Sequence, residues 1–142
     1  MRYAFMTALY LALAILTGGA SVAAAEPDES VESLEQQRIA AAQEAYEQNK
    51  AMVAAGISTK SEEDLYVWSR RWMEAELATT DANSPQRIAT IEKHLKRMQV
   101  LEERGKSLHR TGYDGPTICL PALGYYVMEA ELLLREEKER QE

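Results

Sequence analysis

A five-residue string that occurs twice constrains the fold of this chain more than any other feature. Met73–Leu77 and Met128–Leu132 both read M-E-A-E-L and lie fifty-five positions apart. Each copy lies late in an amphipathic stretch that follows a glycine, Gly56 in the first case and Gly112 in the second. A repeat of this period is typical of a duplicated supersecondary unit. The sequence therefore predicts two consecutive helix–turn–helix units.

Apolar residues recur at spacings of three and four in four segments, and no segment shows the alternation that a β-strand needs. The predicted helices cover residues 31–55, 62–79 and 85–110, and a last one runs to the C-terminus from a start between residues 117 and 121. We therefore predict an all-α fold of two helix pairs, at about 31–80 and 85–140. Short links favour antiparallel neighbours, and two arrangements remain open: a closed four-helix bundle or long antiparallel hairpins.

Helix starts and packing faces follow from the same pattern. Ser61 and Ser84 are expected N-caps, and Pro121 must lie in the first turn of the last helix. Ala75 and Ala130, one from each copy of the repeat, are expected to face a neighbouring helix. The predicted packing face of the first helix consists of Leu34, Ala41, Ala45, Met52 and Ala55.

The first 25 residues have the pattern of a secretory signal peptide. Arg2 precedes an apolar run over residues 4–16, and Ala23–Ala25 offers the small residues that a signal peptidase reads. We expect cleavage before Glu26, which leaves residues 26–142 as a single helical domain in the periplasm or cell envelope, without a membrane span. The alternative is a retained membrane anchor, for which the apolar run is short.

Charge and cysteine content exclude several classes of function. A net charge of −7 disfavours binding to nucleic acid or to an anionic membrane surface. The single Cys119 rules out a disulfide within the chain, and we interpret it as a small hydrophobic residue at a helix start. A catalytic cysteine would need a nearby histidine, but the sequence places neither His94 nor His109 beside it.

The sequence contains no strong signal for a catalytic residue, a cofactor or a metal site. Neither histidine has a second potential ligand three or four positions away, and no phosphate-binding loop or nucleophile elbow is present. One acid from each M-E-A-E-L copy could meet the other across a helix pair and attract a cation. The alternative is that one acid of each copy faces solvent while the other pairs with Arg70, Arg71 or Arg97.

Aromatic and arginine side chains form the candidate interaction surface. Its members are Trp68, Arg70, Arg71, Trp72, Tyr125 and Tyr126. The tryptophans fit a helical core or a partner-binding patch. The arginines fit an anion site, or ion pairs with their stems lying over the tryptophans.

Two groups of motifs resemble a group of uncharacterised exported bacterial helical proteins. They are W-S-R-R followed by E-A-E in residues 68–76, and H-L-K-R-M followed by Y-Y-x-x-E-A-E in residues 94–131. The hairpin pattern is also similar to the helical hairpins of the outer-membrane efflux (TolC-like) family. The first resemblance implies export and a helical fold, and it brings no activity with it.

From the residues we expect a non-enzymatic structural or interaction module that associates with itself or with an envelope protein. The alternatives are a module that binds a small molecule or metal ion between its helices, and, from the resemblance, an efflux-associated component.

Overall fold

The computed structural model describes residues 30–56, 61–112 and 119–142, and every regular element within them is a helix. The helices are α1 (Val31–Ala54), α2 (Glu62–Ala78), α3 (Pro85–Arg110) and α4 (Leu120–Gln141). These bounds confirm the predicted all-α fold. The predicted signal peptide and its cleavage site lie outside the described residues.

Local signals begin the helices where the sequence predicts. The Ser61 hydroxyl accepts a hydrogen bond from the Asp64 backbone N–H at 3.3 Å, and the Ser61 N–H donates to the Asp64 carboxylate at 2.9 Å. This reciprocal capping box satisfies two donors that a helix N-terminus otherwise leaves unpaired. Ser84 caps α3 with Pro85 as its first residue, and Pro121 is the second residue of α4. Proline is tolerated there because the first turn lacks backbone acceptors for its N–H.

The two glycines that precede the repeated stretches have the same backbone role. Gly56 follows α1 with φ of +71°, and Gly112 follows α3 with φ of +76°. This left-handed conformation ends a helix and is accessible to glycine without strain. Equivalent backbone geometry at both positions agrees with two copies of one helix–turn–helix unit.

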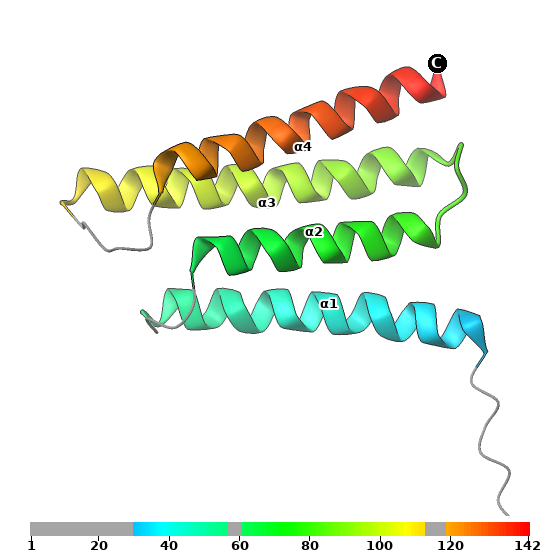
Figure 1. Ribbon diagram of the computed structural model, residues 1–142, viewed down its shortest axis with the longest axis horizontal. Helices are drawn as coiled ribbons and strands as arrows, with labels where there is room; N and C mark the ends of the chain where they lie inside the picture. Colours follow the sequence, from blue (N-terminus) through cyan, green and yellow to red (C-terminus); the bar gives the residue numbers. More distant parts are fainter. Residues whose placement is uncertain (1–29, 57–60, 113–118) are drawn as a thin grey trace, which may run out of the picture.

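The four described helices run up and down in chain order, with α1 and α4 on opposite edges (Figure 1). Extensive packing joins α1 to α2, α2 to α3 and α3 to α4. One hydrophobic cluster nevertheless draws on all four helices, and its buried members are Tyr46, Val53, Leu65, Met98, Leu101, Leu123 and Ala130. The hairpins are therefore joined by a common core rather than being independent units.

The predicted packing face of α1 was wrong by about one residue. Leu34, Ala41 and Ala55 are exposed, Ala45 and Met52 are half-buried, and the buried positions are Ala42, Tyr46, Asn49 and Val53. The ring of Tyr46 lies 6.0 Å from that of Trp72 on α2, between ring centroids. Burial of an aromatic ring contributes far more than burial of a methyl group, so Tyr46 sets the rotation of the helix in place of the alanines.

Candidate functional site

A buried polar network joins α2 to α3 at the centre of the molecule. The Ser69 Oγ lies 2.8 Å from the His94 Nδ1, and the Arg97 Nε donates to the same Oγ at 2.7 Å. Ser69 and His94 are completely buried, and the His94 Nε2 has no hydrogen-bond partner. A serine beside a histidine is the pairing that activates a nucleophile. Here no substrate can reach the hydroxyl, so the pair acts in packing.

Burial lowers the pKa of His94 to about 4, and the positive charge of Arg97 acts in the same direction. The imidazole is therefore neutral at neutral pH. Arg97 in turn lies over two rings, with its guanidinium carbon 4.3 Å from the Trp72 ring centroid and 5.6 Å from that of Tyr46. These cation–π contacts offset part of the cost of burying a charge.

Arg70 joins the two copies of the repeat. Its Nε donates to Glu74 at 2.9 Å, and its Nη1 donates to Glu129 at 2.7 Å. Glu74 and Glu129 are equivalent positions of the two M-E-A-E-L strings. The Tyr66 hydroxyl also donates to Glu129, at 2.6 Å. One acid of each copy thus pairs with Arg70 instead of forming a free carboxylate pair for a cation, and the predicted pairing with an arginine is confirmed.

The hydrogen bond to Glu74 raises the pKa of Arg70 most, and the hydrogen bond to Tyr66 raises it further. Burial, followed by the hydrogen bond to Glu129, raises the pKa of Tyr66. The Tyr66 ring stacks on that of Tyr126 with 3.9 Å between centroids. Arg70 is therefore charged and Tyr66 neutral at neutral pH, and the contacts of both side chains hold α2 against α4.

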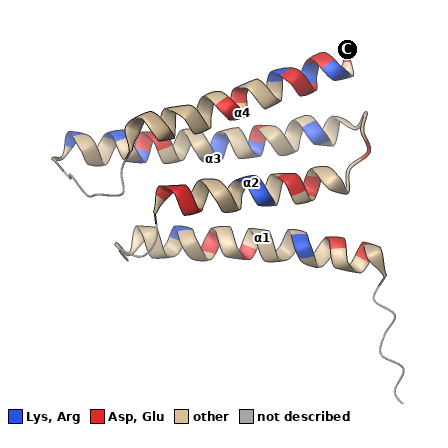
Figure 2. Cartoon of the chain, viewed as in Figure 1, with Lys and Arg blue, Asp and Glu red and all other residues tan. Residues whose placement is uncertain are grey.

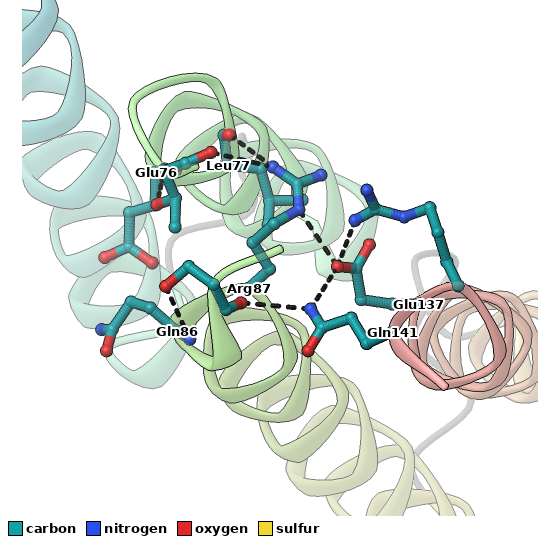
Figure 3. Close-up of polar contacts among 9 residues, drawn as sticks. Glu76, Leu77, Gln86, Arg87, Glu137 and Gln141 are labelled. Carbon is teal, nitrogen blue, oxygen red and sulfur yellow. Dashed lines mark hydrogen bonds and ion pairs between the residues drawn. The ribbon is translucent and has the colours of Figure 1, made fainter. Parts of the chain in front are cut away.

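A second polar cluster ties the α2–α3 turn to the end of α4 (Figure 3). Arg87 donates from its Nε to Glu137 at 3.1 Å and from its Nη1 to the Leu77 carbonyl at 2.8 Å. Gln141 donates to the Ser84 carbonyl at 3.1 Å and to Glu137 at 2.8 Å. Glu137 is buried among these partners. We name Arg87, Glu137 and Gln141 the turn clamp, and its role is to hold elements together.

The six predicted interaction residues lie in different places. Trp68 and Trp72 point from α2 toward α1, and Arg71 lies over the Trp68 ring at 4.7 Å. Arg70 and Tyr126 belong to the cluster between α2 and α4. Tyr125, on α4, and Arg71, on α2, are the two exposed members of the six. The structure therefore does not gather the six into one surface.

A shallow pocket of about 310 Å³ lies between the starts of α2 and α4. Its lining includes Glu62, Glu63, Cys119 and Tyr126. Glu62 is 5% exposed, and its Oε2 has no hydrogen-bond partner. Cys119 is an exposed free thiol at the N-cap of α4. A buried carboxylate oxygen without a partner would gain from a positively charged ligand.

An exposed apolar stripe follows the outer face of α4. Tyr125, Met128 and Leu132 are 55%, 61% and 56% exposed. Their spacings of three and four place them on one face over two turns. They line a groove of about 470 Å³ together with Glu129 and Leu133. We name Tyr125, Met128 and Leu132 the α4 stripe.

The residues that the structure describes contain no group of three or more potential metal ligands. None of the described helices has the length and apolar character needed to cross a membrane.

The chain matches no known protein-family model, no curated protein and no solved structure. The resemblance to exported helical proteins and to TolC-like hairpins therefore stays a prediction.

Sequence reasoning missed the Ser69–His94–Arg97 network and the turn clamp. A signal for His94 was present, because it lies three residues after Ile91 and four before Met98, both on the apolar face of α3. No comparable local signal points to the turn clamp, since Arg87 and Glu137 lie in different helices.

Proposed function

We propose that this chain is an exported, non-catalytic helical module of the cell envelope that binds another protein. The observation that carries the proposal is the α4 stripe. Soluble proteins tolerate single exposed apolar residues, but a row of large ones in consecutive turns is typical of an interaction surface. More than half of the surface of each side chain in the stripe is exposed, and none of the three belongs to the hydrophobic core cluster.

The polar groups favour the same conclusion. The only serine–histidine pair that the described helices bring together is buried, and Glu74 and Glu129 of the repeat are bound by Arg70. These contacts stabilise the helix arrangement, and burial keeps the Ser69 hydroxyl and the His94 imidazole from acting as nucleophile and base. A turnover that depends on Ser69, His94 or Glu129 would contradict a non-catalytic role.

Site-specific photo-crosslinking in intact cells tests the proposal. A photoreactive amino acid replaces Met128 in the full-length chain, and a control carries it at Val100, which is 60% exposed on α3. We expect one discrete crosslinked product from position 128 and none from position 100. Equal, diffuse crosslinking from both positions would contradict an interaction surface on α4.

Export is tested separately. Mass spectrometry of the protein released by osmotic shock should find Glu26 as the first residue. Retention of residues 1–25 would favour the membrane anchor instead.

A second candidate function is the binding of a small organic cation in the pocket between α2 and α4. The unpartnered Glu62 carboxylate favours it, because a buried carboxylate gains from a cationic partner. Tyr126 supplies an aromatic face for the same ligand. Thermal shift assays with alkylammonium ions test this candidate: stabilisation of the wild type that disappears in Glu62→Gln supports it, and equal shifts in both exclude it. An efflux-associated role rests on the resemblance alone.

A further inference from the structure

The charges around the α4 stripe indicate what kind of partner binds there. The first nine residues of α4 carry no charge, whereas its second half carries both signs (Figure 2). Beside and beyond the stripe lie Glu131, Glu136 and Glu139, all exposed. None of these three has a hydrogen bond or ion pair with any residue that the structure describes. Among the exposed basic residues of this helix, Arg135 is likewise unpaired, whereas Lys138 pairs with Glu92 and Arg140 pairs with Glu137.

The rim of the stripe is therefore acidic, because the unpaired carboxylates of Glu131 and Glu136 flank it, whereas Arg135 and Glu139 lie seven positions after Met128 and Leu132 and continue its line. The chain as a whole has a net charge of −7. Charged positions that flank an apolar helical seam select the partner by attraction or repulsion. This rim attracts a seam bordered by lysine and arginine and repels one bordered by acids.

A second copy of the chain fits this surface poorly. In a parallel helix pair, a flanking residue faces the residue five positions later in the other helix, which sets Glu131 against Glu136 of the second copy. In a symmetric antiparallel pair, Met128 of each copy packs on Leu132 of the other. Glu131 of one copy then faces Glu131 of the other. Both arrangements place like charges together beside the seam, and like-charge contacts disfavour association.

We propose, resting on the function proposed above, that the α4 stripe binds an amphipathic helix of another protein whose apolar seam is flanked by lysine and arginine. The apolar side chains of the stripe supply the affinity, and the acidic rim supplies orientation and selectivity. This is recognition of one helix by the exposed face of another. Attraction between exposed charges also makes the interaction sensitive to salt.

Designed peptides test the proposal with protein purified from cells that express the full sequence. The first probe is a three-heptad amphipathic helix with leucine on its seam and lysine or arginine at the flanks. The second has the same seam with glutamate at the flanks, and the third is a scrambled version of the first. Fluorescence anisotropy measures binding of each labelled peptide at low and high salt.

We expect the basic peptide to bind at least tenfold more tightly than the acidic or scrambled peptide, and to weaken with salt. Met128→Ser combined with Leu132→Ser should weaken it at least tenfold. The matched control Val100→Ser should leave it unchanged, because that residue is equally exposed on another helix. Glu131→Gln combined with Glu136→Gln should weaken binding and reduce its salt dependence. All these positions are exposed, so each variant should fold, and circular dichroism checks that it does.

Four results would overturn the inference. Binding of the basic peptide that survives the Met128 and Leu132 substitutions would reflect general charge attraction. A dimer in sedimentation experiments that the same substitutions disrupt would make a second copy the occupant. Binding to phosphatidylcholine vesicles through these residues would mean that the stripe binds a lipid surface and not a protein helix. If position 128 crosslinks to a protein in cells but the basic peptide does not bind, the proposed function stands and this inference fails.

Discussion

His94 is the residue whose charge state the fold controls most strongly. Its imidazole is completely buried, with Ser69 at Nδ1, Arg97 beside it and the Tyr66 ring 6.5 Å away between centroids. Burial lowers its pKa from 6.5 to about 4. A proton on this ring would place a second positive charge beside Arg97 without a counter-charge in contact.

This arrangement predicts a loss of stability in mild acid. The unfolded chain takes up a proton on His94 as the pH falls through 6.5, while the folded chain remains neutral there until about pH 4. The contribution of His94 is therefore fully present above pH 6.5 and is lost between pH 6.5 and 4. The loss at pH 4 is on the order of 3 kcal/mol of unfolding free energy. Urea denaturation at a series of pH values measures it.

His94→Asn isolates this contribution from that of the carboxylates, because asparagine keeps a polar atom near Ser69 but does not titrate. The pH dependence of unfolding should be clearly shallower in this variant between pH 6.5 and 4. His109→Asn, at the exposed end of α3, should behave like the wild type. If the wild type and His94→Asn have parallel profiles, the imidazole does not carry the effect.

Glu74 and Glu129 are equivalent in sequence but differ in surroundings. The Glu129 side chain is 19% exposed and binds both Tyr66 and Arg70, whereas that of Glu74 is 48% exposed and binds Arg70 within one helix. We expect Glu129→Gln to cost about 1–2 kcal/mol and Glu74→Gln no more than about 0.5 kcal/mol. Chemical denaturation of the two variants makes the comparison. Equal losses of unfolding free energy in the two variants would mean that the Arg70–Glu129 pair, which joins α2 to α4, stabilises the protein no more than the Arg70–Glu74 pair within α2.

Helix ends could be predicted from the sequence because their causes are local. Ser61 with Asp64, Ser84 with Pro85, and the two left-handed glycines each act within a few residues of the helix end that they fix. The rotation of α1 could not be predicted in this way. It depends on Tyr46 meeting Trp72 in another helix, and the alanine pattern gave a competing face.

The candidate surfaces were predictable only in part for the same reason. The exposed position of Tyr125 and the pairing of the repeat acids with Arg70 concern residues that the sequence had already singled out. The Ser69–His94 contact joins residues twenty-five positions apart, and the Glu62 pocket joins the starts of two helices. Such sites form through packing between helices, which no short motif in this chain specifies.

The repeat itself makes a prediction about helix packing. Ala75 is 2% exposed and Ala130 is fully buried, so the expectation that both face a neighbouring helix is confirmed. Ala75→Leu and Ala130→Leu should each overpack the contact and cost roughly 1–3 kcal/mol. Ala51→Leu, at an exposed position of α1, should cost little. Thermal melts decide the matter, and a large loss in one variant with none in the other would show that the two strings are not structurally equivalent.

The turn clamp holds the molecule together at the end where α2, α3 and α4 meet (Figure 3). Replacement of Arg87 by methionine removes its bonds to Glu137 and to the Leu77 carbonyl, and it leaves Glu137 with Arg140 and Gln141. We expect a cost of about 1–3 kcal/mol in unfolding free energy. Amide exchange should accelerate in residues 79–84 and in the last turn of α4. A loss of stability spread evenly over all helices would argue against a local clamp.

The packing of each helix mainly on its neighbour in the chain has a consequence for how the molecule forms. Contacts between residues that are near in sequence require only short loops to close, which costs little entropy. Helical proteins with such contacts fold within microseconds to milliseconds. The ring contact between Tyr46 and Trp72 needs only the first hairpin, whereas the bond between Arg87 and Glu137 must wait for the last turn of α4. Assembly can thus follow the order in which the chain leaves a ribosome or a membrane pore, and the turn clamp closes last.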